Sequence, residues 1–337
     1  MREEILSRIQ KKFPLVAKPF EVIANELDIS EDEVLQILQE EKSKNIIRQT
    51  SAIFDTKRLG YKSSLVAFKI SQDKLSDAVK IINSHPGISH NYERNHDFNV
   101  WFTLAVAPDS ILGLEETIEI LAKLTGADEH IMLPTLKLFK ISVKLNTTGK
   151  DEKKEKVNKV EHKELELSEL HHQIIRKAQY DIDMVSEPFK KIIEELNIDY
   201  ETFFSILNEL QEVGIMRRFA SILNHRKAGF NANAMVVWDV DEENGETIGE
   251  TAAAFSAVSH CYLRPKYPNW PYNLFTMVHG KTTEETTAII EDIASEIESK
   301  AHMPLYSSKE FKKVRIEYFT PAFEAWENKY KNISKEL

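Results

Sequence analysis

The sequence contains a single cysteine among its 337 residues, Cys261, which excludes an internal disulfide and fits a reducing compartment. It also lacks any apolar run that approaches the roughly 20 residues needed to cross a membrane. The opening stretch, MREEILSRIQ, carries too many charges for a signal peptide. We therefore expect a cytoplasmic protein with no membrane partner.

Several common catalytic and binding patterns are missing too. The chain has no Gly-rich phosphate loop, no Ser-His-Asp arrangement and no Cys-x-x-Cys zinc pattern. Its net charge of -10 argues against a nucleic-acid partner, because phosphate binding rests on clustered lysine and arginine. ATP-dependent and structural-zinc functions therefore have no support, and we expect no metal site formed by the protein.

The chain does contain an internal duplication. The pattern Ser-His-x-Tyr-x-Arg occurs twice, and its functional side chains are His90, Tyr92 and Arg94 in one copy and His260, Tyr262 and Arg264 in the other. Upstream, IRQTSAIFDTKRLGY matches MRRFASILNHRKAGF in the same order and at nearly the same offset. Chance similarity would not normally keep both order and spacing, so the chain is predicted to hold two repeats.

The second copy of the motif opens an unusual stretch, SHCYLRPKYPNWPYNLFT. If its beginning is extended, side chains alternate between faces, so His260, Tyr262 and Arg264 share one face and Cys261 points to the other. The three prolines that follow predict a loop, and a second strand begins near Tyr272. A hairpin of this composition suits a large, flat, anionic ligand.

The hydrophobic pattern of the first repeat predicts a winged helix-turn-helix and then a ferredoxin-like domain. Helices are expected at 3–12, at 19–27 and after Ser30, where Ser30 and Glu33 form a capping-box pattern. A strand pair at 45–54 could form the wing. The order βαββαβ follows, with strands at 65–70, 88–94, 98–106 and 136–143 and helices at 74–83 and 111–124.

The second repeat predicts the same plan. Its helices are expected at 167–179, 188–196 and 200–212, its wing at 215–223, and its strands at 234–240, 258–264, 272–279 and 311–319. The fold class is α+β: two tandem repeats, each a winged helix-turn-helix followed by a ferredoxin-like βαββαβ domain, packed as an intramolecular pseudo-dimer. The expected domains are 1–55, 56–145, a charged linker at 146–166, 167–223 and 224–337.

The charges on the candidate recognition helices weaken a DNA-binding function. The helix at 199–213 contains four acidic residues and no lysine or arginine, and the helix after Ser30 is also rich in acidic residues. Laying either helix along a phosphate backbone would cost Coulomb repulsion rather than release counterions.

Several long strings resemble one family. NHRKAGFNANAMVVWDV, SHCYLRPKYPNWPYNLFTM and KEFKKVRIEYF resemble the B subunit of siroheme (sirohaem) decarboxylase, and AIFDTKRLGYKSSLVAF, HPGISHNYERNHDFNVWFTL and LPTLKLFKISV resemble its A subunit. The winged helix followed by βαββαβ resembles the Lrp/AsnC architecture. The chain is therefore similar to a fusion of the two subunits, over nearly its whole length apart from the linker.

This resemblance implies a carboxy-lyase. The family removes carbon dioxide from the acetate side chains at positions 12 and 18 of siroheme, giving didecarboxysiroheme for alternative heme or d-type heme biosynthesis. It implies no cofactor beyond the iron of the substrate. Two other functions stay open: a ligand-responsive DNA-binding regulator of the Lrp/AsnC type, and a tetrapyrrole carrier without activity. A further homodimer is also left open.

Siroheme is a flat macrocycle with eight carboxylates, so a site for it needs an apolar slot and cations, with arginine favoured for bidentate contacts. Decarboxylation also needs a proton donor near neutral pKa. The candidate proton donors are His225 and His260, with Tyr262 and Tyr267 as weaker ones. The candidate substrate-binding residues are Arg217, Arg218, Arg226, Lys227, Arg264, Lys266, Trp270, Tyr272, His90, Arg94 and His96.

Each histidine also has a plainer interpretation. His225 could be an exposed turn residue or an axial ligand of the substrate iron, and His260 and His90 could be buried, hydrogen-bonded strand residues. His96 has no histidine counterpart in the second repeat, so it could line a separate surface of the first repeat or the cleft shared by the two repeats. The second repeat is expected to hold the productive site, because it has the denser set of cations and the longer aromatic loop.

Overall fold

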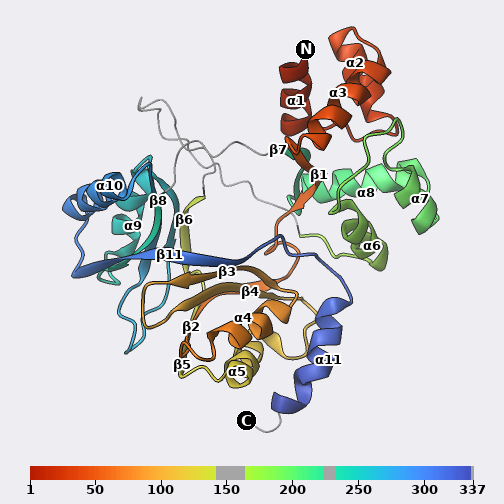
Figure 1. Cartoon of the computed structure of the whole chain (residues 1–337). Helices are drawn as coiled ribbons and strands as arrows, with labels where there is room; N and C mark the ends of the chain where they lie inside the picture. The colour runs from red at the N-terminus through yellow and green to blue at the C-terminus, as the bar shows by residue number, and fades with distance from the viewer. Residues whose placement is uncertain (142–163, 224–231, 335–337) are drawn as a thin grey trace. The chain divides into compact units, whose positions relative to one another are not determined.

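The computed structural model describes residues 1–141, 164–223 and 232–334 (Figure 1). The chain divides into two compact units. Unit 1 comprises Met1–Tyr61, Lys159–Arg226 and Glu317–Pro321, and unit 2 comprises Lys62–Asn158, Lys227–Ile316 and Ala322–Leu337. Each unit therefore draws on both repeats. Within the described ranges, no helix has the length and apolar character needed to span a bilayer.

Each repeat supplies three helices to the described part of unit 1. Ser30 accepts a hydrogen bond from the Glu33 backbone N–H (3.2 Å) and its own N–H donates to the Glu33 carboxylate (3.1 Å), so the predicted capping box is confirmed. Phe13, Phe189 and Phe219 meet in the core, with ring centroids 5.2–6.4 Å apart. The helices are α1 (Arg2–Lys11), α2 (Pro19–Leu27), α3 (Glu31–Ser43), α6 (Glu169–Ala178), α7 (Lys190–Leu196) and α8 (Tyr200–Glu212).

The predicted wings differ from the structure. Residues 45–54 do not form a strand pair: they contribute one strand, β1 (Ile47–Phe54), which pairs antiparallel with β7 (Met216–Leu223) of the other repeat. Thr50 and Ser221 face each other in this register, and their hydroxyl groups are 2.6 Å apart. The two repeats therefore share one two-stranded sheet, because each single strand satisfies its backbone groups with its counterpart.

Unit 2 contains a nine-stranded sheet in the order β5-β2-β4-β3-β11-β8-β10-β9-β6. The first repeat supplies β2 (Lys62–Lys69), β3 (Ile88–Arg94), β4 (Val100–Val106), β5 (Glu129–Leu133) and β6 (Lys137–Ile141), and the second supplies β8 (Ala232–Asp239), β9 (Val258–Leu263), β10 (Leu274–Gly280) and β11 (Ala301–Lys313). Helices α4 (Leu75–Ser84) and α5 (Gly113–Thr125) pack on the first-repeat strands, and α9 (Gly245–Ala254) and α10 (Thr283–Glu296) pack on the second-repeat strands.

Two strands form pairs with the other repeat that the sequence did not predict. The predicted strand at 136–143 is β6, but it pairs with β9 of the second repeat, and β5 completes the first. The strand predicted at 311–319 is β11 at 301–313, which pairs first with β8 of its own repeat and then with β3 of the other. Exchange of these strands joins the two ferredoxin-like halves into one sheet.

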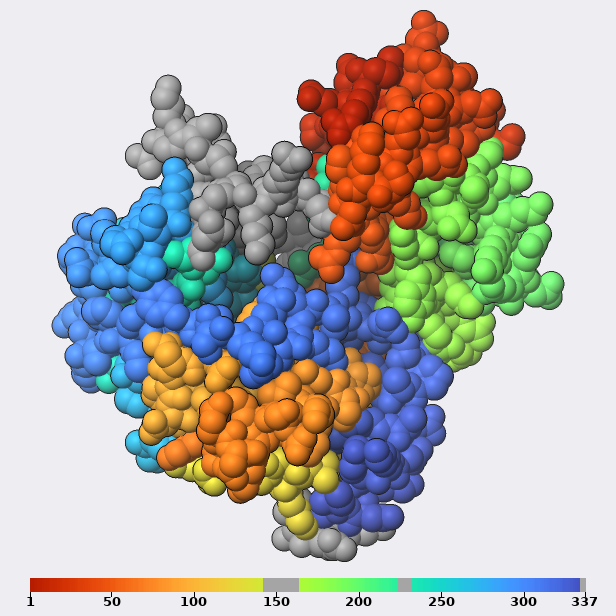
Figure 2. Space-filling view, viewed as in Figure 1, coloured from red at the N-terminus to blue at the C-terminus, as the bar shows by residue number. Residues whose placement is uncertain are grey.

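Three apolar clusters lie in the described part of unit 2. Two lie between strands and helices, and the last helix, α11 (Ala322–Ser334), adds Trp326 to the first-repeat cluster. In Figure 2 the blue atoms of α11 lie beside yellow atoms of the first repeat. The third cluster combines residues from both repeats, including Trp101 of β4, Val237 of β8 and Phe275 of β10. The inner faces of the two halves therefore pack against each other.

Candidate functional site

The two copies of the duplicated motif lie on β3 and β9. Along β9 the side chains alternate as expected: Cys261 is fully buried in the cluster beneath α9, where its Sγ lies 3.5 Å from the Gly249 carbonyl oxygen, while Tyr262 packs on the cluster shared by the two repeats. The prediction that Cys261 points away from the motif face is confirmed. Burial raises the pKa of the Cys261 thiol to about 12, so it is an inert packing residue.

The histidine, tyrosine and arginine of each copy form a stack. The rings of His90 and Tyr92 are nearly parallel with centroids 6.3 Å apart, and those of His260 and Tyr262 repeat this arrangement at 6.2 Å. The guanidinium carbon of Arg264 lies 4.9 Å from the Tyr262 centroid, while in the first repeat the corresponding distance is 5.7 Å. The alternation of the strand produces this row, because residues two apart share a face.

Both motif arginines are buried without a carboxylate partner among the described residues. Arg94 is 7% exposed and donates from Nη1 to the Leu305 carbonyl oxygen at 2.8 Å. Arg264 is 8% exposed and donates from Nη1 to the carbonyl oxygen of Leu133, in the other repeat. The Nε of each has no hydrogen-bond partner in the same ranges.

Burial lowers the pKa of Arg94 and of Arg264 to about 10, so both stay charged at neutral pH. A buried charge is costly unless it is paired and hydrogen-bonded. Each guanidinium thus keeps a buried N–H that lacks a partner among the described residues.

The motif histidines are half-buried and share one kind of partner. His90 Nδ1 lies 3.0 Å from Ser89 Oγ, and His260 Nδ1 lies 2.7 Å from Ser259 Oγ. Burial lowers the pKa of both rings; the charge of His90 adds to the effect at His260, which places the histidines of the two repeats within electrostatic range. At the first ring, Lys313 also lowers the pKa of His90 and Glu310 raises it.

The loop after β9 is more constrained than its sequence suggests. Tyr267 and Trp270 exchange two backbone hydrogen bonds (2.8 and 2.9 Å), which closes a tight turn. The Tyr267 hydroxyl donates to the Met132 carbonyl oxygen (2.5 Å), and Lys266 Nζ pairs with Asp239 at 2.5 Å. The loop is therefore attached to the first repeat and to β8.

Trp270, predicted to bind substrate, lies on the predicted loop, but its side chain is buried within unit 2. Trp270 is 1% exposed and belongs to the cluster shared by the two repeats. Its ring contacts those of Trp101, His96 and Tyr272 at centroid distances of 5.2–5.4 Å. Burying the large apolar surface of the indole ring is more favourable than leaving it in contact with water. His96 is held by the Phe98 N–H, which donates to its Nδ1 at 2.9 Å.

The remaining predicted residues lie elsewhere. Arg217 and Arg218 are exposed on β7 in unit 1, where Arg217 forms an ion pair with Asp55 (2.8 Å). His225, Arg226 and Lys227 lie outside the described residues. The structure thus brings together the motif residues and the loop of unit 2, and the roles of all these residues stay predictions.

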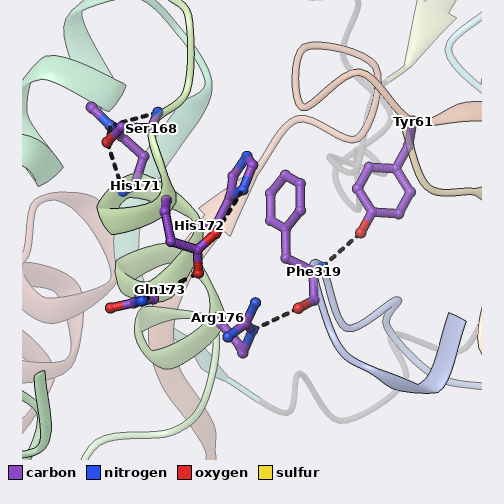
Figure 3. Close-up of polar contacts among 8 residues, drawn as sticks. Tyr61, Ser168, His171, His172, Gln173, Arg176 and Phe319 are labelled. Atoms are coloured by element: carbon purple, nitrogen blue, oxygen red, sulfur yellow. Dashed lines mark hydrogen bonds and ion pairs between the residues drawn. The ribbon is translucent and has the colours of Figure 1, made fainter. Parts of the chain in front are cut away.

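Two histidines of unit 1 make structural contacts and are not candidates for the site (Figure 3). His171 completes the cap of α6 with Ser168, and its Nε2 lies 3.1 Å from Glu209. His172 stacks on Phe319 with centroids 4.1 Å apart. Phe319, at a positive φ of 55°, receives a hydrogen bond from Arg176 (2.6 Å) and donates one to Tyr61 (2.7 Å). These contacts hold the 317–321 segment in unit 1.

Comparison with known proteins agrees with this architecture. A profile for the siroheme decarboxylase NirDL-like HTH domain matches residues 2–48 and 171–217, and a profile for the AsnC-like ligand binding domain matches 58–140 and 227–312. Siroheme decarboxylase from Hydrogenobacter thermophilus is 40% identical over 324 residues, which are 96% of each chain. The chain belongs to the siroheme decarboxylase family. The resemblance inferred from the motif strings is therefore confirmed.

Solved structures of this family have the same fold. A crystal structure of the siroheme decarboxylase NirDL superposes with a TM-score of 0.81 at 35% identity and covers 99% of both chains. A second, of NirDL in co-complex with an iron-uroporphyrin III analogue, gives 0.80 at 35% identity over 98% of both chains. The predicted α+β class with two tandem repeats is confirmed.

Proposed function

We propose that this chain is a siroheme decarboxylase that acts on the acetate side chains at positions 12 and 18. The observation that supports this most is the pair of buried arginines, Arg94 and Arg264, each without a carboxylate partner among the described residues and each beside a tyrosine and a histidine. Because the chain belongs to the siroheme decarboxylase family, the anion expected at such a site is siroheme.

Substrate binding would use charge and flat surface together. A carboxylate of siroheme that receives a hydrogen bond from Arg264 would give the buried guanidinium the partner that it lacks, and charge-assisted contacts of this kind are the strong ones. Arg94 offers the same group on β3. The tyrosine rings beside them provide apolar faces of the size that a macrocycle requires. Carboxylates that do not react would thus be held by the arginines.

The reaction would break one C–C bond and form one C–H bond for each carboxylate removed. Carbon dioxide leaves, its bonding electron pair passes to the methylene carbon and into the macrocycle, and that carbon then accepts a proton. We assign the proton to His260, whose ring stacks on Tyr262 in the motif row; burial lowers its pKa, so its protonated form is a stronger acid than a free histidine. Burial raises the pKa of Tyr262 and of Tyr267, so these hydroxyl groups are weaker donors.

Three finer points belong to the same proposal. The reaction makes the enzyme a carboxy-lyase that needs no organic cofactor. The second repeat provides the productive site, with His225 as a further proton donor or an axial ligand of the substrate iron. Siroheme and didecarboxysiroheme are the partners, and no nucleic acid is bound: the recognition helices α3 and α8 are acidic, which disfavours a regulator.

The test is anaerobic incubation of the purified chain with siroheme, followed by mass spectrometry of the extracted tetrapyrrole. Stepwise loss of two carbon dioxide molecules is expected. Bound but unchanged siroheme would contradict the enzyme and favour a carrier. Failure to bind siroheme at all would contradict both the enzyme and the carrier and would favour a DNA-binding regulator.

A further inference from the structure

A chain of four polar side chains leads away from the motif histidine of the second repeat. His260 Nδ1 lies 2.7 Å from Ser259 Oγ, Ser259 Oγ lies 2.6 Å from His279 Nε2, and His279 Nδ1 lies 2.8 Å from Asn233 Oδ1. The residues come from three neighbouring strands, β9, β10 and β8. His279 and Asn233 are directly opposed in the β10–β8 register. The sequence motif includes only the first two members of this chain.

The last member fixes the direction of every bond. With the Asn233 amide oriented as in the structure, its oxygen faces His279 Nδ1 and can only accept, which assigns the His279 proton to Nδ1. His279 Nε2 then accepts from the Ser259 hydroxyl, and Ser259 Oγ in turn accepts from His260 Nδ1–H. Burial, and then the charge of His260, lower the pKa of His279, which keeps its Nε2 free to accept. The result is a single tautomer at His260.

We propose that His279 is a positioning residue that, through Ser259, holds the His260 proton on Nδ1 and leaves Nε2 as the nitrogen that exchanges a proton with the substrate. This inference rests on the proposed function, since it assigns His260 a proton to donate. It goes beyond the motif, because neither His279 nor Asn233 is part of the duplicated pattern.

In the first repeat no second histidine follows the motif serine in the corresponding place. When the strands after the two motifs are aligned on NVWFTLAV and NLFTMVHG, the position of His279 is occupied by Ala105. Ser89 Oγ there lies 2.7 Å from Thr103 Oγ1 as well as 3.0 Å from His90 Nδ1. A hydroxyl group can donate or accept, so a chain that ends at Thr103 satisfies either tautomer of His90. The two motif histidines are therefore chemically unequal.

The hydrogen-bonded side chains from His260 to Asn233 also suit the proposed proton transfer. When His260 is an imidazolium, Nδ1–H donates to Ser259; after Nε2–H has been given to the substrate carbon, the neutral ring still carries Nδ1–H and keeps the same bond. No hydrogen bond has to be rearranged during the step, and preorganisation of this kind is a major source of catalysis. In the first repeat the ring could relax into either tautomer instead.

The experiment uses the full chain labelled with ¹⁵N-histidine at a pH where the rings are neutral, and long-range ¹H–¹⁵N spectra that distinguish the tautomers. His260, assigned by loss of its signals in His260→Gln, is expected in the Nδ1–H form. His279→Ala and Asn233→Ala should both mix its tautomers, and Asn233→Asp, which keeps an acceptor, should restore the single form. Thr103→Ala is the matched control: it should alter the spectrum of His90 and not that of His260.

Kinetics provide the second readout. His279→Ala and Asn233→Ala should lower kcat about tenfold with little change in KM, and Asn233→Asp should recover most of it. An Nε2–H form of His260 in the unmodified chain, or a spectrum that His279→Ala leaves unchanged, would overturn the inference. If the tautomer results hold but siroheme stays intact, the decarboxylase proposal alone fails and the assignment of His279 stands.

Discussion

At the residue scale, Arg264 carries a positive charge into unit 2 with only carbonyl and hydroxyl oxygens as acceptors among the described residues. Replacing a buried, poorly paired charge by an apolar side chain of similar length is often neutral or stabilising. Arg264→Met should therefore keep or raise the melting temperature. It should also weaken siroheme binding about 10- to 100-fold, because a charge-assisted hydrogen bond is worth about 1.5–3 kcal/mol.

The two effects are measured by thermal unfolding and by titration of siroheme absorbance. Lys80→Met is the control, since Lys80 is an exposed cation on α4 that pairs with Asp77 on the same helix (2.8 Å). It should change neither quantity appreciably. A large drop in the melting temperature of Arg264→Met with unaltered siroheme affinity would show that Arg264 serves the fold rather than the ligand.

A second residue-scale prediction concerns His85, whose Nδ1 accepts from the Gly87 N–H at 2.9 Å beneath the Trp326 ring. Burial, assisted by the charge of Lys312, lowers the pKa of His85 to about 3. The unfolded chain binds the proton first, so this stabilisation is complete above about pH 6.5 and is lost as the pH falls toward 3. At pH 5 the loss should be about 2 kcal/mol of unfolding free energy.

Urea unfolding at pH 7.5 and pH 5 measures this loss. His85→Gln keeps an acceptor for Gly87 and removes the titrating group, so the difference between the two pH values should shrink by most of that amount. His90, His260 and His279 also have lowered pKa values and add a residual slope of the same sign in both proteins. An equal slope in both would exclude His85 as the main source.

At the element scale, a substitution that adds one methyl group to α9 tests whether β6 pairs with the second repeat. A Cβ added to Gly249 of α9 would lie 2.4 Å from the ring carbons of Phe139, a β6 residue. Overpacking of this kind costs about 1–3 kcal/mol, so Gly249→Ala should lower the unfolding free energy by that amount. With Phe139→Ala present, the same change should become neutral or stabilising, because alanine is a better helix former than glycine.

A double-mutant cycle followed by chemical denaturation gives the coupling between the two positions. If β6 paired within the first repeat, as its sequence position suggested, Phe139 would not touch α9 and the two changes would simply add.

The sequence predicted most helices and strands but not how the strands of the two repeats pair. Periodicity and capping reside within a segment, so the strand at 88–94 and the helix at 200–212 were placed with the bounds that the structure has. Alternation along β9 likewise predicted the side of Cys261. Strand pairing depends on distant partners, and nothing local in β6 or β11 distinguishes pairing within a repeat from pairing across it. The burial of Trp270 likewise depends on a distant partner, Trp101 of the other repeat, and no local pattern indicates it.

At the scale of the whole molecule, three strand pairs among the residues that the structure describes link the two repeats: β1 with β7, β3 with β11 and β6 with β9. Covalent connection through the charged run at 150–163 should then be dispensable once the chain has folded. A protease site introduced there and cut in the folded protein should leave both pieces in one complex. Size-exclusion chromatography should give the elution volume of the uncut chain.

The cut protein should differ from the uncut one only in how it unfolds. Its melting temperature should depend on protein concentration, since separation of two pieces follows mass action, whereas that of the uncut chain should not. In strong urea the pieces should separate, which provides the control for complete cleavage. Two native peaks after cutting would mean that the exchanged strands and the shared apolar cluster do not hold the repeats together, and that the linker does.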